Sequence, residues 1–225
     1  MKNILTFFIV LCTVSVIGQT TITKNLGDFT ILKVYNGIDV ELVKSDVQKI
    51  VITGEKSEKV TIKNTRNTLK IYLRFPETLA NNKVKATLYY TKNIKTIDAN
   101  EGSSITSKKF EQQQIEVKTQ EGALINMVLK AKHLTVKAVS GGTVKLTGIV
   151  KNQNVEVGNG GIYNGFNLKA TDMSTVRASL GGKAQVFVGE TLDAKVSFGG
   201  SIFYKGTPEV FKTKKVIGGI IEAKN

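Results

Sequence analysis

The chain has 225 residues, which is enough for one sizeable core and does not require a second domain. One histidine, one cysteine and two prolines argue against a zinc or other soft-metal site, a disulfide scaffold and a proline-rich linker, and we expect no cofactor. The formal net charge of +14 predicts attraction to polyanions such as acidic polysaccharide, lipopolysaccharide phosphates or anionic lipid head groups.

Residues 1–18 have the features of a secretory signal peptide. Lys2 provides a positive start, and the apolar stretch 4–16 is too short to favour a membrane-spanning helix. An alternative is a lipid anchor on Cys12, but Leu11 stands where a small residue would be expected before it. We therefore predict export to the periplasm, the outer cell surface or the medium, which argues against DNA or RNA as a partner.

The mature chain, residues 19–225, is expected to form one domain, and its first part, 19–95, is rich in strands but irregular. Apolar and polar residues alternate there, and turn signals such as Asn36-Gly37 separate the segments. The alternating segments are 30–34, 38–42, 50–52, 60–62, 69–73 and 84–89. We interpret this part either as the first, wider coils of a solenoid or as a β-cap that shields one end of the stack.

A glycine turn recurs through residues 96–225 at intervals of 18 to 21 residues. The glycine is doubled in the last five copies, whereas the first two copies have Gly102-Ser103 and Gly122-Ala123. Such a period indicates a solenoid, in which each coil buries its apolar face by stacking on its neighbours. The first glycines of the seven turns are Gly102, Gly122, Gly141, Gly160, Gly181, Gly199 and Gly218.

The residues around each turn alternate with the period of a strand. Positions five and three before the glycine are mostly small or β-branched, the position between them is charged, and the position three after it is apolar in every copy. We therefore predict an all-β, single-domain parallel β-helix, or β-solenoid, right-handed, with coils of about 19 residues. The alternative is an antiparallel sandwich with unrelated hairpin turns, although hairpins usually recur every 8 to 12 residues or so.

The segments 29–42 and 50–54, a following pair of Val-x-Ile and Leu-x-Ile patterns, and the Gly-Gly coils resemble a bacterial exported family named "putative auto-transporter adhesin, head GIN domain". Gly37-Ile38-Asp39 is similar to the name-giving tripeptide, with Asp in place of Asn. The resemblance implies a single-domain β-helix with no catalytic residues to carry over. An autotransporter carries a long C-terminal translocating barrel, and this sequence stops after a coil, so we do not expect that part of the name to apply.

Motifs for catalysis or cofactor binding are weak in this sequence. His133 stands beside lysines with no nearby nucleophile, so we expect a solvated loop residue. Gly158-Asn159-Gly160 begins like a dinucleotide-binding loop, but Tyr163 occupies the third glycine position and no helix follows. Neither motif supports an enzyme.

Carboxylates converging on one face would favour a rival interpretation, an enzyme acting on acidic polysaccharide. We expect Asp172, Glu190 and Asp193 not to share a position in the repeat. Glu101 and Glu121 do share one, directly before their glycines, and are expected about 5 Å apart. They would form either a cation site or, as we favour, two exposed corner residues neutralised by lysines.

The outward charged position is the candidate binding feature. In-register stacking would align its cations into a ladder, interrupted by Asp98 and Glu156. The ladder is either a solvated face that keeps the protein soluble or a positive stripe for a repeating polyanion. Its members are Lys118, Lys137, Arg177, Lys195 and Lys214.

We therefore predict an exported, non-catalytic β-solenoid that acts as an adhesin or cell-envelope interaction module and binds an acidic polysaccharide or an envelope glycolipid. The alternatives are a carbohydrate-active lyase or hydrolase, and a structural or homo-oligomeric envelope protein. An exposed apolar side would support the last. Phe198, Phe203 and Tyr204 could form it, although we expect these aromatic rings to be buried inside the coils.

Overall fold

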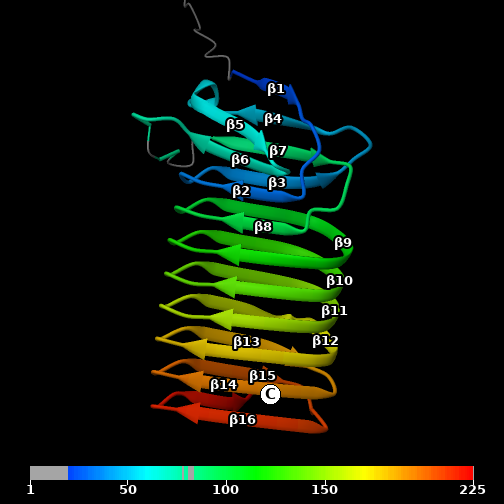
Figure 1. The fold of residues 1–225 in the computed structure, drawn as a ribbon, viewed down its shortest axis with the longest axis vertical. Helices are drawn as coiled ribbons and strands as arrows, with labels where there is room; N and C mark the ends of the chain where they lie inside the picture. Colours follow the sequence, from blue (N-terminus) through cyan, green and yellow to red (C-terminus); the bar gives the residue numbers. More distant parts are fainter. Residues whose placement is uncertain (1–19, 78, 81–83, 225) are drawn as a thin grey trace, which may run out of the picture.

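The computed structural model describes residues 20–77, 79–80 and 84–224, so the predicted signal peptide and Cys12 lie outside the described residues. The described residues form seventeen β-strands, and these belong to one continuous sheet that winds into a solenoid of about seven turns (Figure 1). One 3-10 turn, η1 (Ser57–Lys59), is present, and the described residues contain no α-helix. The predicted all-β solenoid with coils of about 19 residues is confirmed.

Four long strands form the middle of the molecule, and each covers most of one coil (Figure 1). They are β9 (Ser104–Thr119), β10 (Leu124–Ala138), β11 (Thr143–Val157) and β12 (Ile162–Ser179). Consecutive coils pair in parallel, and equivalent positions of the repeat are aligned, as Leu124 is with Thr143. Parallel pairing rules out the antiparallel sandwich.

In the last coils each long strand is replaced by shorter ones. These are β13 (Lys183–Val188), β14 (Thr191–Ser197), β15 (Ser201–Lys205), β16 (Val210–Val216) and β17 (Ile220–Ala223). β13 and β14 both pair with β12, and β15 and β16 continue below them in the same parallel register. The two lateral faces therefore run without interruption into the last coils.

The glycine turns line up along one edge of the solenoid, at the left in Figure 1, which we call the turn edge. All seven predicted glycines have positive φ, between 67° and 77°, and the residue before each also has positive φ. Two successive left-handed residues define a tight turn. Such a turn is closed, for example, by the Ala123 amide donating to the Gln120 carbonyl at 3.2 Å.

The second glycine of each pair is required for a different reason, close approach to the neighbouring coil. A Cβ at Gly161 would lie 2.0 Å from the carbonyl oxygen of Ala138. Ser103 and Ala123 occupy the same position in the first two turns, and both are buried there. The doubling of glycine therefore marks the coils whose backbones approach most closely.

The N-terminal part contains two further coil layers, but they are not stacked in sequence order. β2 (Ile31–Val34) and β3 (Asp39–Lys44) form one layer, which is inserted between two later segments. On one side lie β6 (Thr68–Leu73) and β7 (Lys85–Tyr90), and on the other lie β8 (Thr96–Ala99) and the start of β9. The Asn36-Gly37 turn joins β2 to β3, and its Gly37 amide donates to the Glu101 carbonyl at 2.8 Å, so it extends the turn edge.

Antiparallel strands cover the end of the solenoid at the top of Figure 1. β4 (Lys49–Thr53) pairs with β7, and β1 (Ile22–Asn25) pairs with β4. On the other lateral face β5 (Val60–Thr65) forms a hairpin with β6. The irregular N-terminal part thus supplies both coils and a cap, the two possibilities that the sequence left open.

The interior is one continuous apolar cluster that extends from Phe29 to Ile202. The predicted inward positions are buried in the coils, as Val136 and Ala138 are, whereas Thr213 and Lys215 in β16 are exposed. A polar group at the centre is fully satisfied, because the buried Tyr163 hydroxyl donates to Gln153 Oε1 at 3.1 Å. Burial raises the pKa of this phenol, so Tyr163 remains a neutral donor.

Candidate polyanion-binding face

The predicted charged ladder is aligned in register, and it is longer than the sequence indicated. Lys118 lies opposite Lys137, and Arg177 lies opposite Lys195 on the next coil. Beyond Asp98 the column continues into the N-terminal layers through Lys33, which Asp98 contacts at 3.1 Å. We call the complete set the basic column: Lys63, Lys70, Lys33, Asp98, Lys118, Lys137, Glu156, Arg177, Lys195 and Lys214.

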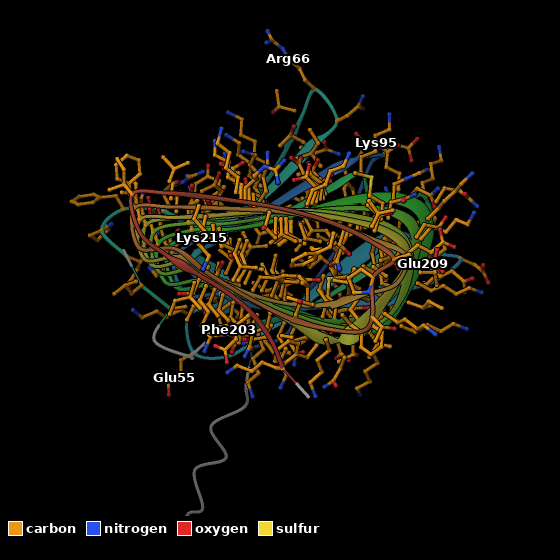
Figure 2. The ribbon with its side chains drawn as sticks, turned by 90° about the horizontal axis from the view of Figure 1, so that it is seen from below. Glu55, Arg66, Lys95, Phe203, Glu209 and Lys215 are labelled. Atoms are coloured by element: carbon orange, nitrogen blue, oxygen red, sulfur yellow. The ribbon has the colours of Figure 1, made fainter. Side chains whose placement is uncertain are left out.

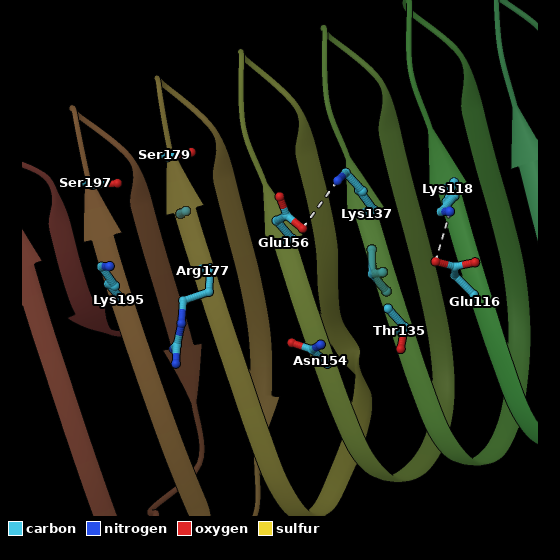
Figure 3. A pocket seen from close by; sticks show the side chains of 12 residues that line it. Glu116, Lys118, Thr135, Lys137, Asn154, Glu156, Arg177, Ser179, Lys195 and Ser197 are labelled. Carbon is cyan, nitrogen blue, oxygen red and sulfur yellow. Dashed lines mark ion pairs between the residues drawn. The ribbon is translucent and has the colours of Figure 1, made fainter.

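Ion pairs compensate the middle of the basic column. Lys118 Nζ lies 3.0 Å from Glu116, and Lys137 Nζ lies 3.5 Å from Glu156 on the next coil (Figure 3). Arg177 binds Asp193 through both of its terminal nitrogens, at 2.9 and 3.1 Å. The hydrogen bond from Arg177 holds the pKa of Asp193 below its usual value, so this carboxylate stays ionised in mild acid.

Two of these acids, Glu116 and Asp193, were not predicted as part of the site. They stand two residues before Lys118 and Lys195, on the same lateral face, and Asp193 reaches Arg177 of the preceding coil. The period-2 alternation of a strand places such residues on one face, so the spacing was the signal that could have identified them.

Positive charge is less compensated in the last coils than in the middle of the basic column. In the described part of the chain no ion pair involves Lys195 or Lys214, and both side chains are exposed. Lys212 lies opposite Asp193 on β16, whereas Lys215 lies opposite the buried Val196 and therefore takes an inward position at the open end of the coils. Lys212 and Lys214 thus add to Lys195 and make this end of the face more basic than its middle.

A shallow groove of about 530 Å³ runs across the basic column from β9 to β14 (Figure 3). It crosses five successive strand segments, so one elongated ligand could contact several coils. Its floor is polar and charged, and the side chains that line it include Glu116, Lys118, Asn154, Arg177, Lys195 and Ser197. A flat groove with repeated cations suits an extended anion better than a small molecule enclosed on all sides.

The carboxylates outside this face do not form a metal site among the described residues, where no group of three potential ligands occurs. Glu101 and Glu121 lie on adjacent coils as expected, with the Gly102 amide donating to the Glu121 carbonyl at 2.9 Å. Glu101 accepts a hydrogen bond from Asn36 at 2.7 Å rather than one from a lysine.

The expectation for the later acids was partly wrong. Glu190 lies beside Asp172, because the Glu190 amide donates to the Asp172 carbonyl at 3.1 Å, and both stand nine residues before their glycines. Asp172 is engaged by Thr171 Oγ1 at 2.6 Å and by Lys151 at 3.5 Å. Asp193 lies on the basic column's face and is held by Arg177.

The two weak motifs of the sequence have structural roles. His133 is exposed as expected, but it lies within β10 and not in a loop, and its Nδ1 lies 3.4 Å from the Asn152 side chain. Asn159 and Gly160 form one of the turns at the turn edge, so this segment is not a dinucleotide-binding loop.

The expectation that the late aromatic residues are buried was wrong for Phe198. Its side chain is 54% exposed, because it occupies the left-handed position before Gly199 at the tip of a turn. Phe203 and Tyr204 are half-buried, and the Tyr204 ring packs on Phe211 with centroids 5.4 Å apart.

Coils stacked in parallel, with their turns along one edge and a charged column on one lateral face, define the molecule as a β-solenoid. The chain belongs to the family described as "Putative auto-transporter adhesin, head GIN domain", whose model matches residues 28–208. No curated protein matched the sequence. Among the described residues no helix is long and apolar enough to cross a membrane.

Solved structures of low sequence identity share the fold. A "putative adhesin" from Bacteroides fragilis has 20% identity and a TM-score of 0.79, with 92% of this chain and 98% of that chain covered. A "putative lipid binding protein" from Parabacteroides distasonis has 20% identity and a TM-score of 0.65, with 92% and 97% covered. A "putative adhesin" from Parabacteroides merdae has 19% identity and a TM-score of 0.63, with 92% and 96% covered.

Proposed function

We propose that this protein is an exported, non-catalytic adhesion module of the cell envelope that binds a polyanionic glycan along the basic column. The observation that carries the proposal is the in-register alignment of the column across the whole stack, with cations repeated at the strand spacing of about 4.8 Å. A linear array of charges at a fixed interval complements a polymer whose carboxylate or phosphate groups also repeat.

The ion pairs within the column determine which residues contribute most to binding. Lys118 and Lys137 already face carboxylates, so a ligand gains less from them than from Lys195 and Lys214. Exposed pairs are weak, about 0–1 kcal/mol, and can exchange partners with an incoming anion. The last coils therefore form the primary contact, and the middle of the column extends it.

Two glycan sources share this chemistry, an acidic polysaccharide and the phosphorylated saccharide part of an envelope glycolipid. Membership of a family described as adhesins and the fold shared with a "putative lipid binding protein" support an envelope ligand of either kind. A carboxylated polysaccharide and purified lipopolysaccharide, tested side by side, distinguish the two.

The test compares charge-matched triple variants in a glycan-binding assay at several salt concentrations. Lys195→Gln, Lys212→Gln and Lys214→Gln together are expected to weaken binding about tenfold or more and to make its salt dependence shallower. Lys118→Gln, Lys137→Gln and Lys195→Gln together should have a smaller effect, since two of these lysines are ion-paired.

Lys132→Gln, Lys145→Gln and Lys169→Gln remove the same charge outside the column and serve as the control. An equal loss of binding in this control and in the variant with Lys195→Gln, Lys212→Gln and Lys214→Gln would mean that net charge alone drives binding, and it would contradict the proposal. No loss in any variant would contradict it as well.

A further inference from the structure

The position before each turn glycine changes character along the turn edge. In the earlier turns it holds polar residues, Asn36, Glu101, Glu121, Ser140 and Asn159. In the last three turns it holds Leu180, Phe198 and Ile217, which are 53%, 54% and 70% exposed. These three side chains occupy consecutive coils, so they form a continuous row that we call the apolar ridge.

The apolar ridge is not explained by the needs of the fold. Its residues have φ of 47°, 49° and 53°, a left-handed conformation that suits Asn or Gly and that is unfavourable for Leu, Phe and above all β-branched Ile. Asn159 takes the same conformation in the same position one coil before Leu180. Large apolar side chains that are both exposed and strained point to a role in binding.

Cations flank the apolar ridge on both lateral faces. On the face of the basic column, Arg177, Lys195 and Lys214 each stand three residues before a ridge residue. On the opposite face, Lys183 Nζ and Lys224 Nζ lie 5.4 and 5.1 Å from the centroid of the Phe203 ring, and Lys224 is also paired with Glu222 at 2.7 Å. Glu209, by contrast, lies at the edge of the solenoid opposite the turn edge (Figure 2).

We propose that the turn edge of the last coils docks onto the surface of an anionic phospholipid bilayer. The ridge side chains would enter the boundary between head groups and acyl chains, and the flanking lysines would contact the anionic head groups. The charge favours a bilayer over a second copy of the chain. Two such edges facing each other would bring the lysines that flank the apolar ridge of one copy close to those of the other, and like charges would repel.

The polar turns at the other end of the turn edge limit the contact to one end of the solenoid. Glu101 and Glu121 are exposed there and would be repelled by anionic lipid. The molecule would therefore bind with its last coils at the membrane and its N-terminal cap projecting away from it.

The first test is sedimentation with vesicles of phosphatidylcholine containing phosphatidylglycerol, with pure phosphatidylcholine vesicles for comparison. The protein should bind the anionic vesicles, and Leu180→Asn, Phe198→Asn and Ile217→Asn together should weaken binding about tenfold or more. This variant introduces the residue already present at position 159, so it should fold, and circular dichroism and thermal unfolding check that it does.

Val128→Asn and Ile149→Asn remove exposed apolar side chains away from the turn edge and should leave vesicle binding unchanged. Binding of the acidic polysaccharide should be unchanged in the ridge variant and weakened in the variant with Lys195→Gln, Lys212→Gln and Lys214→Gln, so the two proposals fail separately. Equal vesicle binding by the ridge variant and the parent protein would overturn the inference. A dimer that light scattering detects in the parent protein and not in the ridge variant would also overturn it.

A tryptophan reporter tests insertion directly, because the sequence contains no tryptophan. In Phe198→Trp the indole should shift its emission to shorter wavelength with anionic vesicles and stay unchanged with the soluble polysaccharide. An indole that remains in water in the presence of bound vesicles would rule out insertion of the ridge.

Discussion

The N-terminal layers and the glycine-turn coils are built from the same in-out strand pattern, but they obtain their register in different ways. In the coils, neighbouring strands belong to consecutive repeats, and the turn fixes their alignment. Leu124 and Thr143, for example, are equivalent positions of two consecutive repeats and lie opposite each other. In the N-terminal part, Ile31 lies between Thr68 and Thr96, which are distant in sequence. Local turn chemistry is therefore sufficient to set the strand register in the coils, whereas long-range packing sets the register in the N-terminal part.

The two regions nevertheless share one core, and a matched pair of core substitutions tests whether they unfold together. Leu88 in β7 and Leu146 in β11 are both fully buried, one near the cap and one in the coils. Leu88→Ala and Leu146→Ala should each lower the free energy of unfolding by about 2–5 kcal/mol. Denaturant unfolding followed by circular dichroism should show one transition in both variants, and a separate early transition in Leu88→Ala would divide the molecule into two units.

The second residue of the turn pair differs between the later coils, where it is glycine, and the first coils, where it is serine or alanine. Gly161→Ala places a Cβ against the Ala138 carbonyl and should destabilise the protein by about 1–3 kcal/mol, as overpacking does. Ala123 occupies the same position in an earlier turn, and Ala123→Gly should cost less, about 1 kcal/mol or below, because glycine gives the unfolded chain more conformational freedom. Thermal unfolding of the two variants compares them, and a smaller loss in Gly161→Ala would contradict the close approach.

The ion pair between Arg177 and Asp193 predicts an acid-sensitive contribution within the coils. The pKa of Asp193 is lowered in the folded state, so the pair stabilises the protein at pH above the unfolded-state pKa of 3.8, and this stability is lost as pH falls through the folded-state value. The pair is partly exposed and screened, so Asp193→Asn should cost about 0.5–1 kcal/mol at neutral pH. The difference in unfolding free energy between Asp193→Asn and the parent protein should be largest at neutral pH and should shrink as the pH falls below 3.8.

The smallest expected effects come from the left-handed turn position. Leu180→Asn should leave stability unchanged or raise it by about 0.5–1 kcal/mol, because Asn tolerates positive φ. The reciprocal change, Asn159→Leu, should lower stability by a similar amount. Urea unfolding of both variants provides the comparison, and a clear loss in Leu180→Asn would show that the ridge contributes to the fold.

The sequence was sufficient to predict the coils because their periodicity, turn glycines and strand alternation all point to the same arrangement. It predicted the alignment of Lys118 with Lys137 for the same reason. It could not show that β2 and β3 are inserted between later segments, since no local pattern encodes which distant strands become neighbours.

Sequence reasoning was least successful where side chains contact each other across coils or leave the core. The pairing of Arg177 with Asp193 depends on rotamers and on a diagonal contact, which a column of identical positions does not indicate. The exposure of Phe198 was missed because aromatic residues are more often buried, and only its place before Gly199 signals otherwise.

The central claim is that consecutive coils are stacked in parallel with equivalent positions aligned, and a cysteine cross-link tests it most directly. With Cys12 replaced by Ser, Lys137→Cys and Glu156→Cys create an in-register pair on adjacent coils, close enough for a disulfide, whereas Lys137→Cys and Asn154→Cys create a pair offset by two residues. Mass spectrometry after mild oxidation should find the cross-link in the first protein and free thiols in the second. A cross-link in the offset pair with free thiols in the in-register pair would contradict the stacking.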